Sequence, residues 1–291
     1  MKILIIGGEG QLGNSLTKLS KNESFAQFQT TTIDQLDLSK EENIEIFFEK
    51  QSFDYVVNCT AYTAVDKAEN DQVTARLINA KAIQWIGRYA KLKGAGVIHI
   101  STDYVFSGES NLPLTTKDIV NPNSVYGITK AEGEQLLMQE NKNSIIIRTS
   151  WLYSEYGSNF LKTMLKLGAE KEEIKVVFDQ IGTPTYASDL ASAILHILKT
   201  VALDSTHFVP DVYHYSNEGV CSWYDFAQMI FKLAKLKCKI EAVRSDLFPT
   251  IAKRPAYSVM DKAKIKKQFN IAIPFWVDSL EKCLKEMNEL K

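Results

Sequence analysis

A run with four glycines near the start of the chain limits its fold more than any other feature of the sequence. The short apolar run Ile3–Ile6 leads directly into residues 7–13, GGEGQLG, and a helix-like segment follows. A tight turn needs a residue that can take a positive φ, and a helix that packs closely on a strand needs a residue without a Cβ. Gly7 suits the first need and Gly13 the second. The run therefore predicts a strand, a tight turn and a helix that begins near Gln11.

The same run has the features of a phosphate-binding turn. Pyrophosphate binding requires backbone N–H groups with no Cβ in the way, as at Gly10, and a helix N-terminus adds about half a positive charge. Glycine-rich turns also join strands to helices in proteins that bind no ligand, so the run alone leaves its role open. The residues expected to bind the pyrophosphate of a dinucleotide are Gly7, Gly10, Gln11, Leu12 and Gly13.

Short apolar runs alternate with helix-like segments up to about residue 150. The strand candidates, rich in β-branched residues, are Ile3–Ile6, Thr31–Ile33, Tyr55–Asn58, Val97–Ile100 and Ile145–Arg148, and the helical candidates are Asn43–Lys50, Val73–Lys93 and Tyr126–Asn141. This alternation is typical of a parallel sheet covered on both faces. We predict an α/β fold in which a Rossmann-like, doubly wound sheet forms a dinucleotide-binding domain over residues 1–150.

The alternation weakens after residue 150. Three helical pieces are separated by turn-rich stretches, and they are Phe160–Leu167, Ala187–Leu198 and Trp223–Leu236. We predict that residues 151–291 form mainly a smaller C-terminal substrate-binding lobe, with some segments that return to the first domain. The lysine-rich run Lys262–Lys267 is interpreted as the solvated face of a helix.

Charge and cysteine content exclude several classes of protein. Lysine and arginine total 34 against 35 acidic residues, so a net charge of -1 gives no reason to expect a nucleic-acid or membrane partner. The apolar N-terminus turns into glycines too early for a signal peptide or a membrane span. Cys59, Cys221, Cys238 and Cys283 lie too far apart for a zinc or redox pair. We expect a cytoplasmic protein with reduced thiols and a small-molecule ligand.

Two acidic residues follow the second strand candidate. Asp34 lies about twenty residues after the glycines, where a dinucleotide fold places the acid that holds the adenosine ribose. Asp37 could accept from the adenine amine while Leu38 covers the ring face. Either acid could instead be an ordinary loop residue. No arginine adjoins Asp34, so the choice between NADH and NADPH stays open.

Tyr126 and Lys130 are four residues apart at the start of a helical candidate, so both side chains project from one face. A nearby ammonium and the cofactor's positive ring would stabilise a phenolate, and the lysine could also hold the nicotinamide ribose. Exposed pairs with this spacing are common, so the pair alone does not decide. Thr102 follows the fourth strand candidate, where its hydroxyl could donate to a carbonyl oxygen or form a turn. The glycine run, the strand-end hydroxyl and the tyrosine-lysine pair are rarely combined in this order by chance.

With these residues the chain resembles the dTDP-4-dehydrorhamnose reductases of the extended short-chain dehydrogenase/reductase superfamily. The resemblance spans nearly the whole chain. It is carried by Gly7–Gly13, Asn58–Glu69, Ile78–Ala80, Ser101–Phe106, Tyr126–Lys130, Arg148–Trp151, Asp179–Thr185 and Arg254-Pro255. The stretch Asn58–Glu69 is the more discriminating one.

The resemblance implies hydride transfer from NADPH or NADH to the C4 carbonyl of a dTDP-linked 4-keto-deoxysugar, giving dTDP-L-rhamnose. Tyr126 would protonate the oxygen, Thr102 would polarise the carbonyl, and Lys130 would lower the tyrosine's pKa and anchor the ribose. The remaining implied contacts are Ala61, Tyr62 and Thr63 with the cofactor, Thr102 and Asp103 with the sugar, Trp151 with the substrate and Arg254 with the phosphates. From the residues alone, Trp151 is equally well a core aromatic, and Arg254 is somewhat more readily a surface ion pair.

The chain departs from this family at two positions. Some members build a magnesium site at a dimer interface from glutamates, and this chain has Ser15 and Ser188 at two of those places. Hydroxyls replace carboxylates poorly at a hard cation, so we predict no metal there and leave the mode of homodimer formation open.

The sequence is also compatible with two other functions. A related nucleotide-sugar epimerase or dehydratase would recycle its cofactor, and a non-catalytic regulatory subunit would bind it only as a structural element. Net consumption of NAD(P)H separates the first from a reductase. Intact Thr102, Tyr126 and Lys130 argue against the second.

Overall fold

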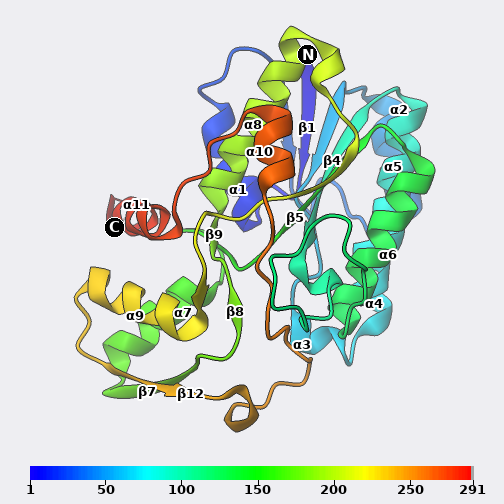
Figure 1. The fold of residues 1–291 in the computed structure, drawn as a ribbon. Coiled ribbons are helices and arrows are strands. Elements are labelled where there is room, and N and C mark those ends of the chain that lie inside the picture. The colour runs from blue at the N-terminus through cyan, green and yellow to red at the C-terminus, as the bar shows by residue number, and fades with distance from the viewer. Residues whose placement is uncertain (290–291) are drawn as a thin grey trace.

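The centre of the computed structural model, which describes residues 1–289, is a parallel sheet of six strands in the order β10-β5-β4-β3-β1-β2 (Figure 1). The elements of the first half are β1 (Lys2–Ile6), α1 (Gln11–Ser20), β2 (Gln27–Thr31), α2 (Glu41–Lys50), β3 (Tyr55–Asn58), α3 (Val65–Ala68), α4 (Gln72–Arg76), α5 (Ala82–Leu92), β4 (Gly96–Thr102), α6 (Val125–Glu140) and β5 (Ser144–Thr149). The predicted Rossmann-like α/β class is confirmed.

Helices cover both faces of this sheet because its strands are apolar on both sides. In β1, Ile3 and Ile5 belong to one buried cluster, which includes residues of α1 and α8 (Ala187–Leu203). Leu4 and Ile6 belong to a second cluster, with residues of α2, α5 and α6. Figure 1 shows these two groups of helices on opposite sides of the sheet. Burial on both faces explains why the central strands carry continuous apolar runs.

The predicted strand Thr31–Ile33 is wrong, because the second strand is Gln27–Thr31. β2 lies at the edge of the sheet, and the side chains of Gln27 and Gln29 are exposed. An edge strand needs no continuous apolar run, and its polar alternation hides it from a search for such runs.

The predicted single helix Val73–Lys93 is also wrong. It consists of α4, a π-helical turn over Leu77–Lys81, and α5. The side chain of Asn79 in this turn bonds with two backbone atoms of Tyr62, and Gly133 of α6 packs on its carbonyl, where a Cβ would lie 2.0 Å from the oxygen. Side-chain spacing does not reveal such a turn, which is often found at functional sites.

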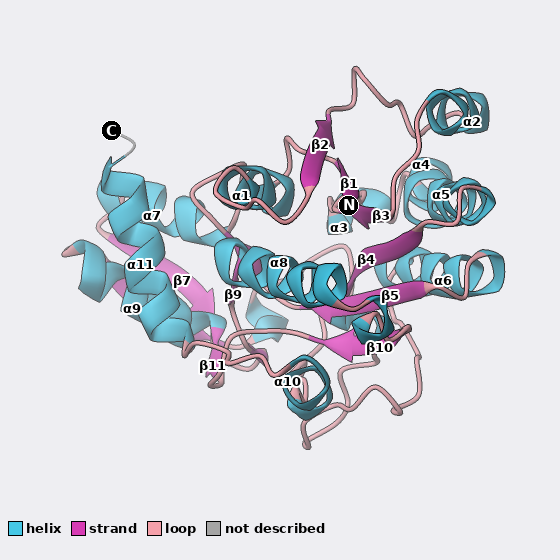
Figure 2. Ribbon diagram, turned by 90° about the horizontal axis from the view of Figure 1, so that it is seen from above, coloured by secondary structure: helices cyan, strands magenta, loops and turns pink. Residues whose placement is uncertain are grey.

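Residues after 150 are divided between the sheet and a second lobe. Helix α8 packs on α1, and β10 (Asp211–His214) pairs with β5. The other elements are β6 (Leu152–Tyr153), α7 (Phe160–Glu170), β7 (Glu173–Val177), β8 (Ile181–Gly182), β9 (Thr185–Tyr186), β11 (Cys221–Ser222), α9 (Trp223–Ala234), β12 (Lys239–Val243), α10 (Ala263–Phe269) and α11 (Trp276–Glu289). Seen from above, α7, α9 and α11 lie together beside the sheet (Figure 2).

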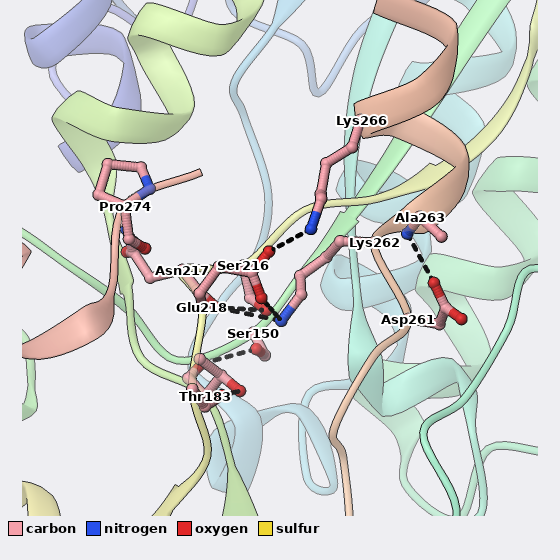
Figure 3. A network of polar contacts seen from close by, with 11 residues as sticks. Ser150, Thr183, Ser216, Asn217, Glu218, Asp261, Lys262, Ala263, Lys266 and Pro274 are labelled. Atoms are coloured by element: carbon pink, nitrogen blue, oxygen red, sulfur yellow. Dashed lines mark hydrogen bonds and ion pairs between the residues drawn. The ribbon is translucent and has the colours of Figure 1, made fainter. Parts of the chain in front are cut away.

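Lys262 corrects the prediction that the lysine-rich run is a solvated helix face. It is 8% exposed, and its Nζ donates to Asn217 O at 3.2 Å and lies 3.3 Å from Glu218 Oε2 (Figure 3). Lys266, which is exposed, pairs with the same glutamate at 2.8 Å. The first lysine of the run precedes α10 and points into the loop that carries Asn217, so the helical spacing does not govern it.

Candidate functional site

The predicted site residues gather where the central strands end. In parallel sheets of this kind, ligands bind outside the carboxyl ends of the strands at the place where the chain leaves in opposite directions. Here β1 lies between β2 and β3, so the chain from β1 goes to one side and later returns to the other. The glycine turn follows β1, the segment with Ala61 follows β3, and Thr102 is the last residue of β4.

The glycine turn has the predicted geometry. Gly7 has a φ of +86°, and the N–H groups of Gly7 and Gly8 both donate to Thr31 O, at 3.2 and 2.9 Å. Gly10 precedes α1, and no side chain caps this end of the helix. The first N–H groups of α1 are thus left for a ligand, as an anion-binding turn requires.

Gln11 and Leu12 contribute to this turn mainly through their backbone. Leu12 is buried in the core of the sheet. Gln11 Oε1 accepts from Ser154 Oγ at 3.0 Å and from Asn159 Nδ2 at 2.8 Å. The side chain of Gln11 therefore joins the glycine turn to the second lobe.

Gly13→Ala is expected to destabilise the protein. A Cβ at this position would lie 2.0 Å from Gly7 O and 2.7 Å from Gly7 C, so backbone must move. Overpacking of this kind costs about 1–3 kcal/mol, measurable by urea denaturation. The matched control is Gly10→Ala, whose Cβ would be 3.4 Å from Gly7 O and should change the free energy of unfolding far less. Equal stability of the two variants would contradict the close-packing role of Gly13.

The acids predicted at the adenosine end lie beside the glycine turn. Ile33 N donates to Glu9 at 3.3 Å, which holds the turn that carries Asp34 against the loop of the glycines. Asp34 is exposed. Asp37 accepts from Ser39 N at 2.9 Å, and hydrogen bonds from Ser39 lower the pKa of this carboxyl. Leu38 is packed in the core against α2 and α5, so little of its side chain can cover a ring.

The segment Ala61–Thr63 is held against the neighbourhood of α6. Tyr62 N donates to Asn79 Oδ1 at 2.8 Å, and Asn79 Nδ2 lies 3.1 Å from Thr129 Oγ1. The hydroxyl of Tyr62 donates to Asp71 at 3.0 Å. These contacts link the loop after β3 to the helix that carries Tyr126 and Lys130.

Thr102 is both a turn former and a site residue. Its Oγ1 accepts from Tyr104 N at 3.2 Å and donates to Asp103 Oδ1 at 3.0 Å. The Thr102 hydroxyl must therefore break its hydrogen bond with Asp103 before it can donate to a substrate carbonyl. Asp103 is 2% exposed, and its Oδ2 makes no hydrogen bond of good geometry within the described chain, although the Ser258 hydroxyl is close enough to lower the pKa of this carboxyl. Burial raises the pKa of Asp103 to about 6. An unpaired buried oxygen is expected to find its partner on a ligand.

Tyr126 is placed by the first turn of α6. Ser124 caps the helix by accepting from Gly127 N at 3.2 Å. A Cβ on Gly127 would lie 2.2 Å from Tyr104 O, so the helix start sits directly on the turn that follows Thr102. The rings of Tyr104 and Tyr126 meet edge to face with centroids 5.5 Å apart. The structure thus brings together the strand-end hydroxyl and the tyrosine.

Lys130 points into the protein. It is 1% exposed, its Nζ donates to Ile100 O at 2.6 Å, and the same atom lies 3.1 Å from His99 Nε2. Burial lowers the pKa of Lys130 to about 8. Burial also raises the pKa of Tyr126, so the protein's own groups do not produce the lowered tyrosine pKa that the sequence predicted. Desolvation is the main cause, and the nearby Asp103 and Tyr104 add to it, whereas Lys130 does not lower the pKa of the phenol in the absence of a cofactor.

A cavity of about 770 Å³ lies mainly in the second lobe and reaches the turn after β4 at Tyr104. Its lining includes Tyr104, Phe160, Met164, Trp223 and Arg254. The proposed catalytic residues lie next to Tyr104 but do not line this cavity themselves. The lining is largely apolar and includes a few charged residues such as Arg254, as is usual for a small-molecule site.

Arg254 lines this cavity, and Trp151 packs behind the lining residue Trp223. Trp151 has a φ of +48° and stacks on Trp223 with ring centroids 3.6 Å apart. Arg254 Nη2 lies 2.5 Å from Asp66 Oδ2, and Nη1 donates to the hydroxyl of Tyr104 at 3.4 Å. The ion-pair alternative for Arg254 is therefore realised, although the side chain also lines the cavity.

Sequence reasoning assigns no role to His99, Tyr104 or Trp223. Tyr104 lies inside a motif that was already singled out, so its position between two predicted residues is a usable signal. His99 lies in an apolar strand, where a histidine is usually a core residue. Trp223 stacks on a residue 72 positions earlier, and no local pattern predicts that contact.

Ser15 and Ser188 are buried on α1 and α8, which pack on each other. Ser15 Oγ donates to Gln11 O at 3.1 Å. In residues 1–289 no three or more His, Cys, Asp or Glu side chains are grouped as a metal site. The magnesium prediction itself stays a prediction. The four cysteines are free, and within the same range no helix combines the length and apolarity needed to cross a membrane.

Comparison with known proteins places this geometry in a family. Residues 1–289 match the family described as RmlD substrate binding domain. The chain is 37% identical over 286 residues to dTDP-4-dehydrorhamnose reductase of Aggregatibacter actinomycetemcomitans, with 96% of this chain and 97% of the relative covered.

Solved structures agree. A dTDP-4-dehydrorhamnose reductase from Clostridium acetobutylicum superimposes with a TM-score of 0.93 at 38% identity, covering 99% of this chain and 100% of that one. The enzyme of the same name from Bacillus anthracis, in complex with NADP, gives a TM-score of 0.90 at 34% identity, covering 98% and 99%. The chain therefore belongs to the RmlD family, whose members include the dTDP-4-dehydrorhamnose reductases compared above.

Proposed function

We propose that the protein reduces the C4 keto group of dTDP-4-dehydro-L-rhamnose to dTDP-L-rhamnose, with NADPH or NADH as the reductant. The observation that carries the proposal is that Thr102, Asp103, Tyr126 and Lys130 lie together at the end of β4, on the same edge of the sheet as the glycine turn after β1. Relatives with the corresponding name support the substrate, and the NADP complex of one of them supports the cofactor.

The chain has a cradle that fits a dinucleotide. The uncapped N-terminus of α1 and the turn at Gly7 suit a pyrophosphate, with Gly10, Gln11, Leu12 and Gly13 supplying backbone. Asp34, Asp37 and Leu38 would border the adenosine, Ala61–Thr63 the nicotinamide half, and Lys130 its ribose. When bound, the reduced nicotinamide supplies the hydride.

Tyr126 is proposed to donate the proton that the sugar oxygen receives. Reduction needs a neutral phenol at the start of the step, and the raised pKa of Tyr126 keeps the phenol protonated at neutral pH. Asp103 Oδ2, buried and unpaired, would accept from a sugar hydroxyl. That contact would draw the carboxylate toward the sugar and release the hydroxyl of Thr102 to polarise the carbonyl.

The second lobe is proposed to bind the dTDP part of the substrate. Trp151, stacked on Trp223, offers an apolar wall, and Arg254 in the cavity lining could exchange its contact with Asp66 for a phosphate. On this proposal residues 1–150 bind the dinucleotide and residues 151–291 mainly the substrate. A cytoplasmic location fits four free thiols, and a magnesium-free homodimer remains part of the proposal.

One assay tests the proposal. Purified protein is mixed with dTDP-4-dehydrorhamnose and either NADPH or NADH, and the loss of reduced-nicotinamide absorbance is followed. Stoichiometric loss with formation of dTDP-L-rhamnose is expected. Product formation without net loss would indicate an epimerase or dehydratase, and cofactor binding without turnover would indicate a regulatory subunit.

A further inference from the structure

A chain of buried hydrogen bonds reaches Lys130 from the neighbouring strand. Asn58, the last residue of β3, and His99 of β4 are directly opposite each other in the sheet, and both are fully buried. Asn58 Nδ2 lies 3.1 Å from His99 Nδ1, and His99 Nε2 lies 3.1 Å from Lys130 Nζ. The imidazole thus joins a neutral amide to the amine of the proposed catalytic lysine.

The orientation of the Asn58 amide is fixed by its other contacts. Its Oδ1 accepts from Thr60 N at 3.1 Å and from Thr60 Oγ1 at 2.6 Å. A backbone N–H can only donate, so the amide oxygen must face Thr60 and the NH2 group must face the ring. His99 Nδ1 is therefore an acceptor and carries no proton.

This orientation of the ring determines which protonation state of Lys130 is compatible with the contact. A neutral imidazole that is unprotonated at Nδ1 carries its proton on Nε2, and that N–H points at Lys130 Nζ. An ammonium has three donors and no acceptor, so it cannot accept from this N–H. An uncharged amine can accept from Nε2–H and donate to Ile100 O in the same arrangement.

We propose that Asn58 fixes the ring tautomer of His99 so that the ring donates to Lys130, and that this contact holds the lysine as an uncharged amine while it rests on His99 and Ile100. His99 is then a positioning residue. A bound dinucleotide offers ribose hydroxyls as other acceptors, so its binding is expected to free the amine from the ring and to be accompanied by proton uptake. This last step rests on the proposed function.

The charged groups around Lys130 are consistent with this arrangement. Glu134, one turn further along α6, raises the pKa of the lysine, but its two oxygens are held by Arg148 of β5 at 2.9 and 2.7 Å. His99 also titrates, and burial lowers its pKa well below the usual value even without a charge on the lysine. Tyr126, on the same helix, is kept neutral by its raised pKa. The ring therefore does not become a cation in place of the lysine.

The ring tautomer is measured directly by NMR of protein labelled with ¹⁵N-histidine, in the absence of cofactor. The chain has four histidines, and the signals of the other three are assigned with His196→Gln, His207→Gln and His214→Gln. We expect the proton of His99 on Nε2. A proton on Nδ1 would overturn the proposal, and neither result depends on the sugar substrate.

Asn58→Asp is expected to reverse the tautomer of the His99 ring. A carboxylate can still accept from Thr60, but it faces His99 Nδ1 with an oxygen, so the proton should move to Nδ1 and leave Nε2 as an acceptor for an ammonium. The midpoint of the Lys130 titration, followed by ¹³C-lysine NMR and assigned with Lys130→Met, should rise by about one pH unit or more. An unchanged tautomer would contradict the proposal. Thr60→Val is the matched control, because the backbone donor remains and the tautomer should not change.

Proton uptake is measured by titration calorimetry with NADPH in buffers of different ionisation enthalpy. Above pH 8 the wild-type protein should take up as much as about one proton per NADPH bound. Lys130→Met should lack this proton uptake. Equal uptake by the two proteins would overturn the link between cofactor binding and the lysine. Because no sugar is present, a failure of the proposed reductase activity would not affect this result.

Discussion

Tyr126→Phe is expected to reduce turnover by a factor on the order of a hundred or more while cofactor affinity stays nearly unchanged. The substitution removes only the hydroxyl, and phenylalanine keeps the edge-to-face contact with Tyr104. The sugar oxygen would then receive its proton from water, which the site holds less well aligned. Turnover is measured by loss of reduced-nicotinamide absorbance, and affinity by fluorescence titration with NADPH.

The neighbouring tyrosine provides the control. Tyr104 is on the adjoining turn, and its hydroxyl accepts from Arg254 rather than facing the strand-end hydroxyl. Tyr104→Phe should therefore affect the Michaelis constant more than the turnover number. If Tyr126→Phe retained wild-type turnover, or if both variants lost turnover equally, Tyr126 would not be the proton donor.

Much of the fold was predictable because the central strands are buried on both faces. The ends of β3 were predicted to the residue, and β1, β4 and β5 to within two residues. The edge strand β2 was missed because it needs no continuous apolar run, and the π-helical turn was missed because it differs from an α-helix by backbone bonding rather than by side-chain spacing. In both cases the structure of a segment depends on its tertiary environment, and the sequence of the segment alone does not specify that environment.

The site residues also fall into those that local spacing predicts and those that depend on tertiary structure. The glycine turn and the pair Tyr126 and Lys130 are local patterns, so spacing alone indicates that their members act together. Asn58 and His99 are 41 positions apart, and they become neighbours only through the register of β3 and β4. A single sequence predicts both strands without predicting that register, and so it cannot show that a histidine in the core contacts the lysine.

Lys130→Met is expected to lower both the turnover and the affinity for NADPH. Methionine matches the length of the lysine stem and suits a buried position, so the fold should be retained. The variant loses the amine that would hold the ribose and support Tyr126. A hydrogen bond to a charged group is worth about 1.5–3 kcal/mol, so affinity should fall by roughly ten- to a hundredfold.

The turnover number of Lys130→Met should fall further than its affinity, because the phenolate left after proton donation has lost its nearby cation. Lys91→Met, the same change at an exposed position of α5, is the control and should behave as wild type in both measurements. An unchanged affinity for NADPH would remove the ribose contact from the proposal. An unchanged turnover would show that the buried amine serves only to fill the space between His99 and Ile100, since those are the partners on which it rests.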